Sequence, residues 1–333
     1  MRRSKGLMSL LGAILILGAC GSNESAAPEA EPSEGSEPES TETYTIGITQ
    51  LMEHPSLNQA TEGFQQALEE SDLHVEFDIQ NAQGDNSAND SIASNLAGQN
   101  VDLIFANSTP SAQAALGKTT DIPIVFTSVV DPVGAELIDS MEEPGGNVTG
   151  TSHHHPDSIP VALEFLSEEL GAEKVGIVYN AGEQNSRAQI DRIQEQMDEY
   201  GLELVEATVS TSAEVKQATE SIVDQVDAFY IITDNMVVSA FESVADVATS
   251  QKVPLLAADI DSVPRGAFAA FGVDFTEIGY RAGEMAIQIL KGEKTPAEIP
   301  AEPPKTLKFM VNKEVAETIG VDIKPEWEAE IYE

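Results

Sequence analysis

Short apolar segments of strand length alternate with amphipathic segments of helix length along most of this sequence. Alternating strands and helices favour a parallel sheet that is covered by helices on both faces. The sequence therefore predicts an α/β fold. In the first half we expect strands at 44–49, 74–80, 101–106 and 122–126, and helices at 57–70, 87–96 and 111–117.

The alternation starts again after the Gly-rich segment 144–150. We therefore predict two Rossmann-like lobes with parallel sheets, linked by a hinge. The first lobe comprises 44–152 with about 275–304, and the second comprises 153–274 with about 305–333. The second half has expected strands at 174–179, 203–208, 227–232 and 253–257, and expected helices at 159–170, 186–200, 213–223, 237–250 and 277–290.

The first 19 residues have the pattern of an export signal. Arg2, Arg3 and Lys5 precede an apolar run at 7–17, which is too short for a permanent membrane span. The run ends in Leu17-Gly18-Ala19-Cys20, which resembles a bacterial lipobox and contains the only cysteine. We expect a signal peptide at 1–19, an acylated, palmitate-bearing Cys20, and a disordered acidic linker up to residue 43. The alternative is an ordinary signal peptide with a coincidental cysteine.

The charge of the chain excludes several classes of partner. Cleavage before Cys20 removes three of the 17 cations and none of the 57 acids, so the net charge changes from −40 to −43. Such a charge argues against nucleic acid and against direct binding to an anionic membrane surface. The single cysteine leaves no disulfide framework.

Several ordered blocks are similar to one protein family, and they extend over about residues 44–320. The chain resembles the substrate-binding lipoproteins of ABC transporters that are related to tryptophan- and tyrosine-binding proteins. In one block it departs from the pattern, because Ser152 is followed by His153, His154 and His155 where we expect Ser-Asp. The blocks are 46–55 (IGITQLMEHP), 81–85 (NAQGD), 109–110 (TP), 122–132 (IPIVFTSVVDP), 144–150 (PGGNVTG), 179–186 (YNAGEQNS), 233–235 (TDN), 259–274 and 290–293 (LKGE).

The resemblance implies a type I periplasmic-binding-protein fold and a function in transport. The expected protein is a monomeric, extracytoplasmic, non-enzymatic lipoprotein without cofactor or metal, anchored to the membrane through Cys20. It would capture a small solute, with tryptophan or tyrosine first, and deliver it to the permease subunits of an ABC importer. Because of the departure at 153–155, the resemblance leaves open which residue binds the cationic end of the ligand.

The residues that follow the predicted strands are the candidate ligand-binding residues, because ligands bind at the carboxyl ends of parallel strands. Hydroxyl groups near a helix N-terminus can bind a carboxylate, and carboxylates or amide oxygens can bind an ammonium group. His54 either presents a flat face to the ligand or fixes a turn. Asp234 and Asn235 either contact the ligand or only cap a helix. Asp131 before Pro132 is better explained as a turn residue. The candidates are Ser108, Thr109, Thr127, Ser128 and Ser152 for hydroxyl groups; Glu53, Asp234, Asn235 and Asp259 for the ammonium; Asn180, Glu183 and Asn185 from the opposite lobe; and His54.

Four alternative functions remain to be compared with this one. An enzyme lacks support, because the chain has no G-x-S-x-G elbow, no phosphate loop and no second cysteine. A zinc site at His153–His155 lacks an accompanying H-E-x-x-H pattern. A sugar-binding protein would need aromatic faces, and Trp327 is the only tryptophan. A ligand-sensing lipoprotein would share fold and site, so the sequence does not distinguish it from a transport protein.

Overall fold

The computed structural model describes residues 43–333, and the predicted signal peptide and Cys20 lie outside that range. Its first sheet is fully parallel, with the strand order β2-β1-β3-β4-β5. The central strands β3 and β4 are buried along their whole length, as expected for apolar runs covered on both faces. The strands are β1 (Thr43–Gln50), β2 (His74–Asn81), β3 (Leu103–Asn107), β4 (Ile124–Val129) and β5 (Val148–Ser152).

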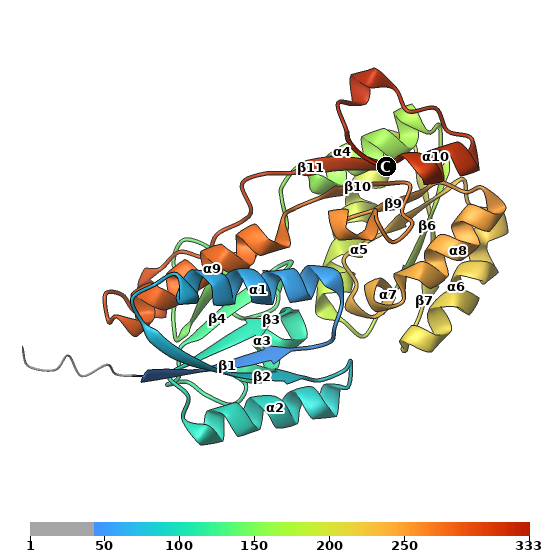
Figure 1. Cartoon of the computed structure of the whole chain (residues 1–333). Coiled ribbons are helices and arrows are strands. Elements are labelled where there is room, and N and C mark those ends of the chain that lie inside the picture. The colour runs from blue at the N-terminus through green and yellow to red at the C-terminus, as the bar shows by residue number, and fades with distance from the viewer. Residues whose placement is uncertain (1–42) are drawn as a thin grey trace, which may run out of the picture. The chain divides into compact units, whose positions relative to one another are not determined.

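Helices cover both sides of this sheet. Figure 1 shows α1 and α9 side by side on one side and α2 on the other. We call this sheet and its four helices the first lobe. Because α9 comes from the C-terminal third of the chain, the first lobe is built from two distant segments. The helices are α1 (Pro55–Glu69), α2 (Asn86–Gln99), α3 (Thr109–Leu116) and α9 (Phe275–Leu290).

The second sheet has the order β12-β11-β10-β9-β8-β6-β7, and β10 and β11 form its one antiparallel pair among the described residues. We call it, with its helices, the second lobe. No helix in residues 43–333 has the length and apolar character needed to cross a membrane. The elements are β6 (Lys174–Tyr179), β7 (Glu203–Thr208), β8 (Ala228–Ile231), β9 (Leu255–Ala257), β10 (Ala269–Gly272), β11 (Lys308–Asn312), β12 (Glu330–Tyr332), α4 (Ser158–Glu164), α5 (Gln184–Met197), α6 (Val215–Ile222), α7 (Asn235–Ser239), α8 (Phe241–Gln251) and α10 (Lys313–Ile319).

The structure corrects the predicted elements at three places. The Gly-rich segment 144–150, after which we expected the second series of strands and helices, lies in the first lobe, because its end forms part of the buried edge strand β5. The predicted helix 237–250 is two helices, separated at Ala240, whose backbone leaves the helical region. The predicted helix 159–170 continues beyond α4 as a π-helix, Phe165–Glu169. The predicted lobe boundaries stay a prediction.

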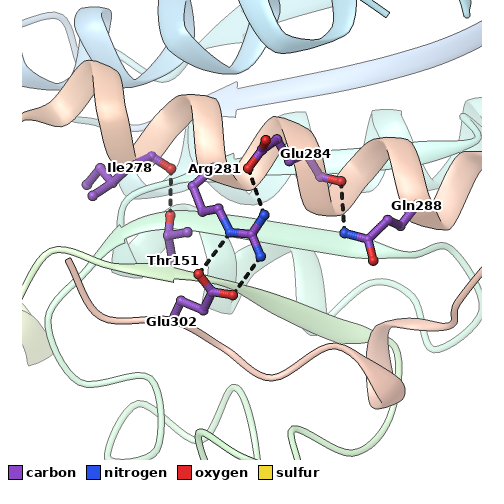
Figure 2. A network of polar contacts seen from close by, with 6 residues as sticks. All are labelled: Thr151, Ile278, Arg281, Glu284, Gln288 and Glu302. Atoms are coloured by element: carbon purple, nitrogen blue, oxygen red, sulfur yellow. Dashed lines mark hydrogen bonds and ion pairs between the residues drawn. The ribbon is translucent and has the colours of Figure 1, made fainter. Parts of the chain in front are cut away.

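Hydrogen bonds and ion pairs connect α9 to the end of β5 and to the segment before β11 (Figure 2). The guanidinium of Arg281 donates to both carboxylate oxygens of Glu302 at 2.7 and 2.8 Å, and also to Glu284 at 2.7 Å. Arg281 lowers the pKa of the Glu302 carboxyl. At the end of β5 the Thr151 hydroxyl donates to the Ile278 carbonyl at 3.0 Å. These contacts join the ends of β5, α9 and the segment before β11 on the side of the first lobe.

The backbones of α1 and α9 lie very close together. A Cβ atom on Gly279 would lie 1.9 Å from the carbonyl oxygen of Ala60, and one on Gly63 would lie 2.2 Å from the carbonyl oxygen of Thr276. Since backbone atoms cannot move aside as a side chain does, glycine is required at this helix crossing.

Replacing Gly279 with alanine should force α1 and α9 apart and destabilise the first lobe. We expect a loss of roughly 1–3 kcal/mol of unfolding free energy, the usual cost of overpacking. Thermal and urea unfolding of the purified protein measure this loss. The control is Gly98→Ala on α2, where an added Cβ meets nothing within 4 Å; alanine there should be neutral or stabilising. Equal stability of both variants would contradict the close approach of α1 and α9.

Candidate functional site

A small cavity lies between the two lobes. The cavity has a volume of about 20 Å³, so the side chains of the two lobes nearly fill the space between them. Its lining contains two carboxylates and two imidazoles, and none of the lining residues is Lys or Arg. The lining residues are His54, Ser56, Leu57, Ser128, His153, Asn185, Thr233, Asp234, Asn235, Val238, Asp259 and Phe275.

Asp234 is fully buried at the start of α7. One carboxylate oxygen accepts from the backbone N–H of Val237 at 2.9 Å and thereby caps the helix. The other accepts from the Asn180 N–H at 2.7 Å and from the Ser186 hydroxyl at 2.6 Å. Burial raises the pKa of Asp234 despite these donors. The capping interpretation is therefore confirmed, and the same carboxylate also lines the cavity.

Asp259 follows β9 in the second lobe and receives a hydrogen bond from the first lobe. The Ser56 hydroxyl on α1 donates to it at 3.3 Å, and the Ser262 hydroxyl donates to its other oxygen at 2.8 Å. Burial, with a smaller contribution from the charge of Asp261, raises the pKa of Asp259 to about 6. This carboxylate therefore changes its charge near neutral pH and would be stabilised in its charged form by a cation.

Both imidazoles in the cavity are neutral at physiological pH. Burial lowers the pKa of His54 to about 3, with help from the positive charge of Arg265. Burial lowers the pKa of His153 to about 3 as well. His54 also caps α1, since its Nδ1 accepts from the Leu57 N–H at 3.5 Å. His54 therefore caps α1 and lines the cavity, and its contact with a ligand stays a prediction.

Glu183 lies behind the cavity and positions two residues that line it. Its carboxylate accepts from Asn235 Nδ2 at 2.6 Å and from Asn185 Nδ2 at 3.2 Å. Burial, followed by the charge of Asp234, raises the pKa of Glu183. Because both amide nitrogens are held from behind, the amide oxygens of the two asparagines are oriented away from Glu183.

The structure brings six of the thirteen predicted site residues into the cavity: His54, Ser128, Asn185, Asp234, Asn235 and Asp259. The other seven lie elsewhere. Glu53 is exposed, Ser108 caps α3, Thr109 is buried, and Thr127 hydrogen-bonds to Thr151. The Ser152 hydroxyl donates a hydrogen bond to the Val130 carbonyl. Asn180 and Glu183 line a wider groove beside the cavity.

Six lining residues were not predicted: Ser56, Leu57, His153, Thr233, Val238 and Phe275. Ser56, Leu57 and Val238 are on helices, in positions that the pattern assigns equally well to the core. Thr233 directly precedes the predicted Asp234. The signal for His153 was the departure from the family pattern directly after Ser152. The three neighbouring imidazoles do not converge, since His153 contacts Thr233 and His155 accepts from the Asp157 N–H. In the described part of the chain no group of three or more metal-ligating side chains occurs.

The lobes are joined by direct contacts on more than one side of the cavity. Besides the Ser56–Asp259 bond, Gln59 on α1 donates to Asp261 at 2.8 Å. Away from α1, Arg192 on α5 lies 3.2 Å from Asp131, which follows β4 in the first lobe. Asp131 also accepts from the Gly134 N–H at 3.0 Å, as the predicted turn requires. Asp131 therefore fixes a turn and forms an ion pair between the lobes.

Residues 45–330 match the family described as ABC transporter substrate binding protein. The chain belongs to this family. It is 40% identical to the tyrosine-binding protein of Clostridioides difficile (strain R20291), over 96% of this chain and 94% of the relative. Membership implies a location outside the cytoplasm, and the two-lobed α/β fold is that of type I periplasmic binding proteins.

Two solved structures indicate which arrangement of the lobes this substrate-binding protein has. The structure of an ABC domain in complex with L-Trp from Streptococcus pneumoniae has 30% identity and a TM-score of 0.83, covering 87% of this chain and 100% of the other. The ligand-free, open structure of a substrate binding protein with adhesive properties from Clostridium difficile has 39% identity but a TM-score of only 0.66, covering 87% and 99%. A lower score at higher identity indicates a different placement of the lobes, so the arrangement here is closer to that of the L-Trp complex.

Removing the charge of Asp131 should shift the substrate-binding protein toward an open arrangement. Asp131→Asn keeps an oxygen for the Gly134 N–H but loses the ion pair with Arg192. Because the pair is about one-quarter to one-third exposed, we expect a small effect, roughly 0.2–1 kcal/mol. Small-angle X-ray scattering of the free protein should show a larger radius of gyration. The control is Asp72→Asn, which breaks an ion pair with Lys291 within the first lobe. Identical scattering of all three proteins would contradict this prediction.

Proposed function

We propose that this protein captures a free aromatic amino acid, tyrosine or tryptophan, between its lobes and releases it unchanged to the permease subunits of an ABC importer. The observation that carries the proposal is the charge of the cavity, which has two buried carboxylates and no Lys or Arg in its lining. Among the residues that the structure describes, Asp234 and Asp259 accept hydrogen bonds only from hydroxyl and backbone N–H groups. A buried carboxylate without a cationic partner is costly, and a ligand with an ammonium group would offset that cost. The relative that binds tyrosine and the neighbour that contains L-Trp support the choice of ligand.

The ligand carboxylate can be bound without a cationic side chain. The first turn of α1 supplies His54, Ser56 and Leu57 to the lining, and the N-terminal end of this 15-residue helix carries a partial positive charge. The Ser128 hydroxyl is buried and has no partner within residues 43–333, so it is available as a donor. This arrangement replaces the site that we expected at Ser108 and Thr109.

The apolar part of the cavity suits an aromatic side chain better than a sugar. Phe275 and His153 have ring centroids 5.6 Å apart, and Leu57 and Val238 add aliphatic surface. Sugar-binding sites use aromatic faces and many carboxamides. Trp327 is not available for this, because it packs on Phe165 in the core of the second lobe with ring centroids 5.0 Å apart.

Capture requires the lobes to open, since residues of both lobes line the cavity and a ligand can enter only when the lobes part. Closure then assembles the site from both lobes, because His54, Ser128 and Phe275 belong to the first lobe and Asp234 and Asp259 belong to the second. A hinge motion of this kind binds the ligand and holds it until the permease opens the lobes. A monomeric protein is sufficient for this function.

Asp259→Asn should weaken binding of L-tyrosine or L-tryptophan roughly tenfold to hundredfold, since a hydrogen bond to a charged group contributes about 1.5–3 kcal/mol. Isothermal titration calorimetry measures the loss. Asp246→Asn on the exposed face of α8 is the charge-matched control and should bind as the wild type does. If none of the twenty common amino acids gives heat with the wild type, the proposed ligand class is wrong.

The pH dependence of binding follows from the raised pKa of Asp259, about 6. The ammonium of the ligand stays charged over this range and needs the ionised carboxylate. The association constant should therefore be highest above pH 7 and should fall by up to tenfold per pH unit below about pH 6. Asp259→Asn should lack this inflection. The same inflection in both proteins would assign it to another group, such as Glu183.

We also propose that Cys20 anchors the protein to the outer face of the cytoplasmic membrane after cleavage before it. Cys20→Ser should move the protein from the membrane fraction to the soluble extracytoplasmic fraction, and mass spectrometry of the wild type should show an acylated N-terminal cysteine. A variant that stays with the membrane, or an unmodified wild-type cysteine, would contradict the anchor.

A further inference from the structure

The hydrogen-bond network behind the cavity fixes which nitrogen of His153 carries the proton. Gln189 Nε2 donates to the Asn185 carbonyl at 3.1 Å, and Gln189 Oε1 accepts from the Thr233 N–H at 3.2 Å, which orients this amide. The Thr233 hydroxyl oxygen lies 2.8 Å from the same Oε1. Two oxygens at this distance need a proton between them, so the hydroxyl donates to Gln189.

The same hydroxyl oxygen lies 2.8 Å from His153 Nε2. Since its only proton is already donated to Gln189, it must accept here, and His153 Nε2 is therefore the protonated nitrogen. The neutral ring then has a lone pair on Nδ1. Although the Ser128 carbonyl lies nearby and favours the charged ring, burial outweighs it and lowers the pKa of His153 to about 3.

The Nδ1 lone pair is buried and has no hydrogen-bond partner in the described part of the protein. His153 lines the cavity between the lobes. A buried acceptor without a donor is unfavourable, so this atom is a point at which a ligand that brings an N–H or O–H group would be bound preferentially.

A second acceptor of the same kind lies in the same cavity. The Nδ2 of Asn185 is held by Glu183 and by the Thr233 carbonyl, at 3.2 and 3.4 Å. Its Oδ1 is buried and, within residues 43–333, unpartnered. Thr233 thus orients both acceptors, one through its hydroxyl and one through its carbonyl.

We propose that His153 Nδ1 and Asn185 Oδ1 accept hydrogen bonds from the ammonium group of the bound amino acid. This inference rests on the proposed function and adds His153 as a residue that determines specificity. An ammonium group has three N–H donors and no lone pair, so it can donate to the two neutral acceptors and to the carboxylate of Asp259, while the charge of Asp234 adds to the attraction. A phenol or indole group would bring only one donor. A ligand without the ammonium would leave both acceptors unpaired.

The test is a cycle of two ligands and two proteins, measured by calorimetry with displacement titration for weak ligands. The ligands are L-tyrosine and its deaminated analogue, 3-(4-hydroxyphenyl)propanoate. His153→Phe keeps a flat ring but removes the acceptor, and it should weaken L-tyrosine at least tenfold while it changes the affinity for the analogue less than threefold. His155→Ala, outside the cavity lining, is the control and should leave both affinities unchanged.

Equal losses for both ligands, or no loss for either, would overturn the role of His153 in ammonium binding. If wild-type protein binds neither amino acids nor the analogue, the proposed function fails instead. A second measurement needs no ligand. Long-range proton–nitrogen NMR of the free, folded wild type should show His153 as the neutral Nε2–H tautomer between pH 5 and 8. A spectrum of the Nδ1–H tautomer, or of a charged ring, would overturn the assignment.

Discussion

The cost of burying carboxylates between two lobes governs most of the architecture around the site. Asp234 and Asp259 are almost completely shielded from water, and their donors are hydroxyl and backbone N–H groups instead of cations. Neutral donors stabilise an ionised carboxylate only in part. The raised pKa of each carboxyl shows that part of the cost of burying its charge remains. A cation that enters the cavity would remove this cost, and under the proposed function the ammonium group of the ligand is that cation.

The two imidazoles that line the cavity, those of His54 and His153, leave its negative charge uncompensated because both rings are neutral. A charged histidine would neutralise the carboxylates and compete with the ligand, but burial keeps His54 and His153 uncharged. The Nδ1 lone pair of His54 caps α1. The Nδ1 of His153 is buried without a hydrogen-bond partner among residues 43–333, and its residue lines the cavity. His153, which stands where we expected an aspartate, therefore contributes a neutral ring to the cavity lining instead of a carboxylate.

The sequence was sufficient for the parts of the structure that follow from periodicity. Continuous apolar runs predicted β3 and β4, and the rule that ligands bind at the carboxyl ends of strands located Ser128, Asp234 and Asp259. It was insufficient where contacts depend on distant segments. Phe275 lines the cavity only because α9 returns to pack on α1, and no local pattern gives that register. Glu53 follows a strand as the rule requires, yet it is exposed, since the rule gives the edge of the sheet and not the direction of a side chain.

Closure and ligand binding use the same atoms, and this couples them. Asp259 accepts a hydrogen bond from Ser56 of the opposite lobe while it lines the cavity. When the lobes part, Ser56 withdraws and the carboxylate becomes accessible to water, which lowers the cost of its charge without any ligand. When the lobes close, water is excluded and the charge needs a partner. A cation therefore binds the closed arrangement more tightly than the open one, and this differential affinity is what shifts the population toward closure. The ion pair of Asp131 with Arg192 adds a contribution to closure that does not depend on the ligand.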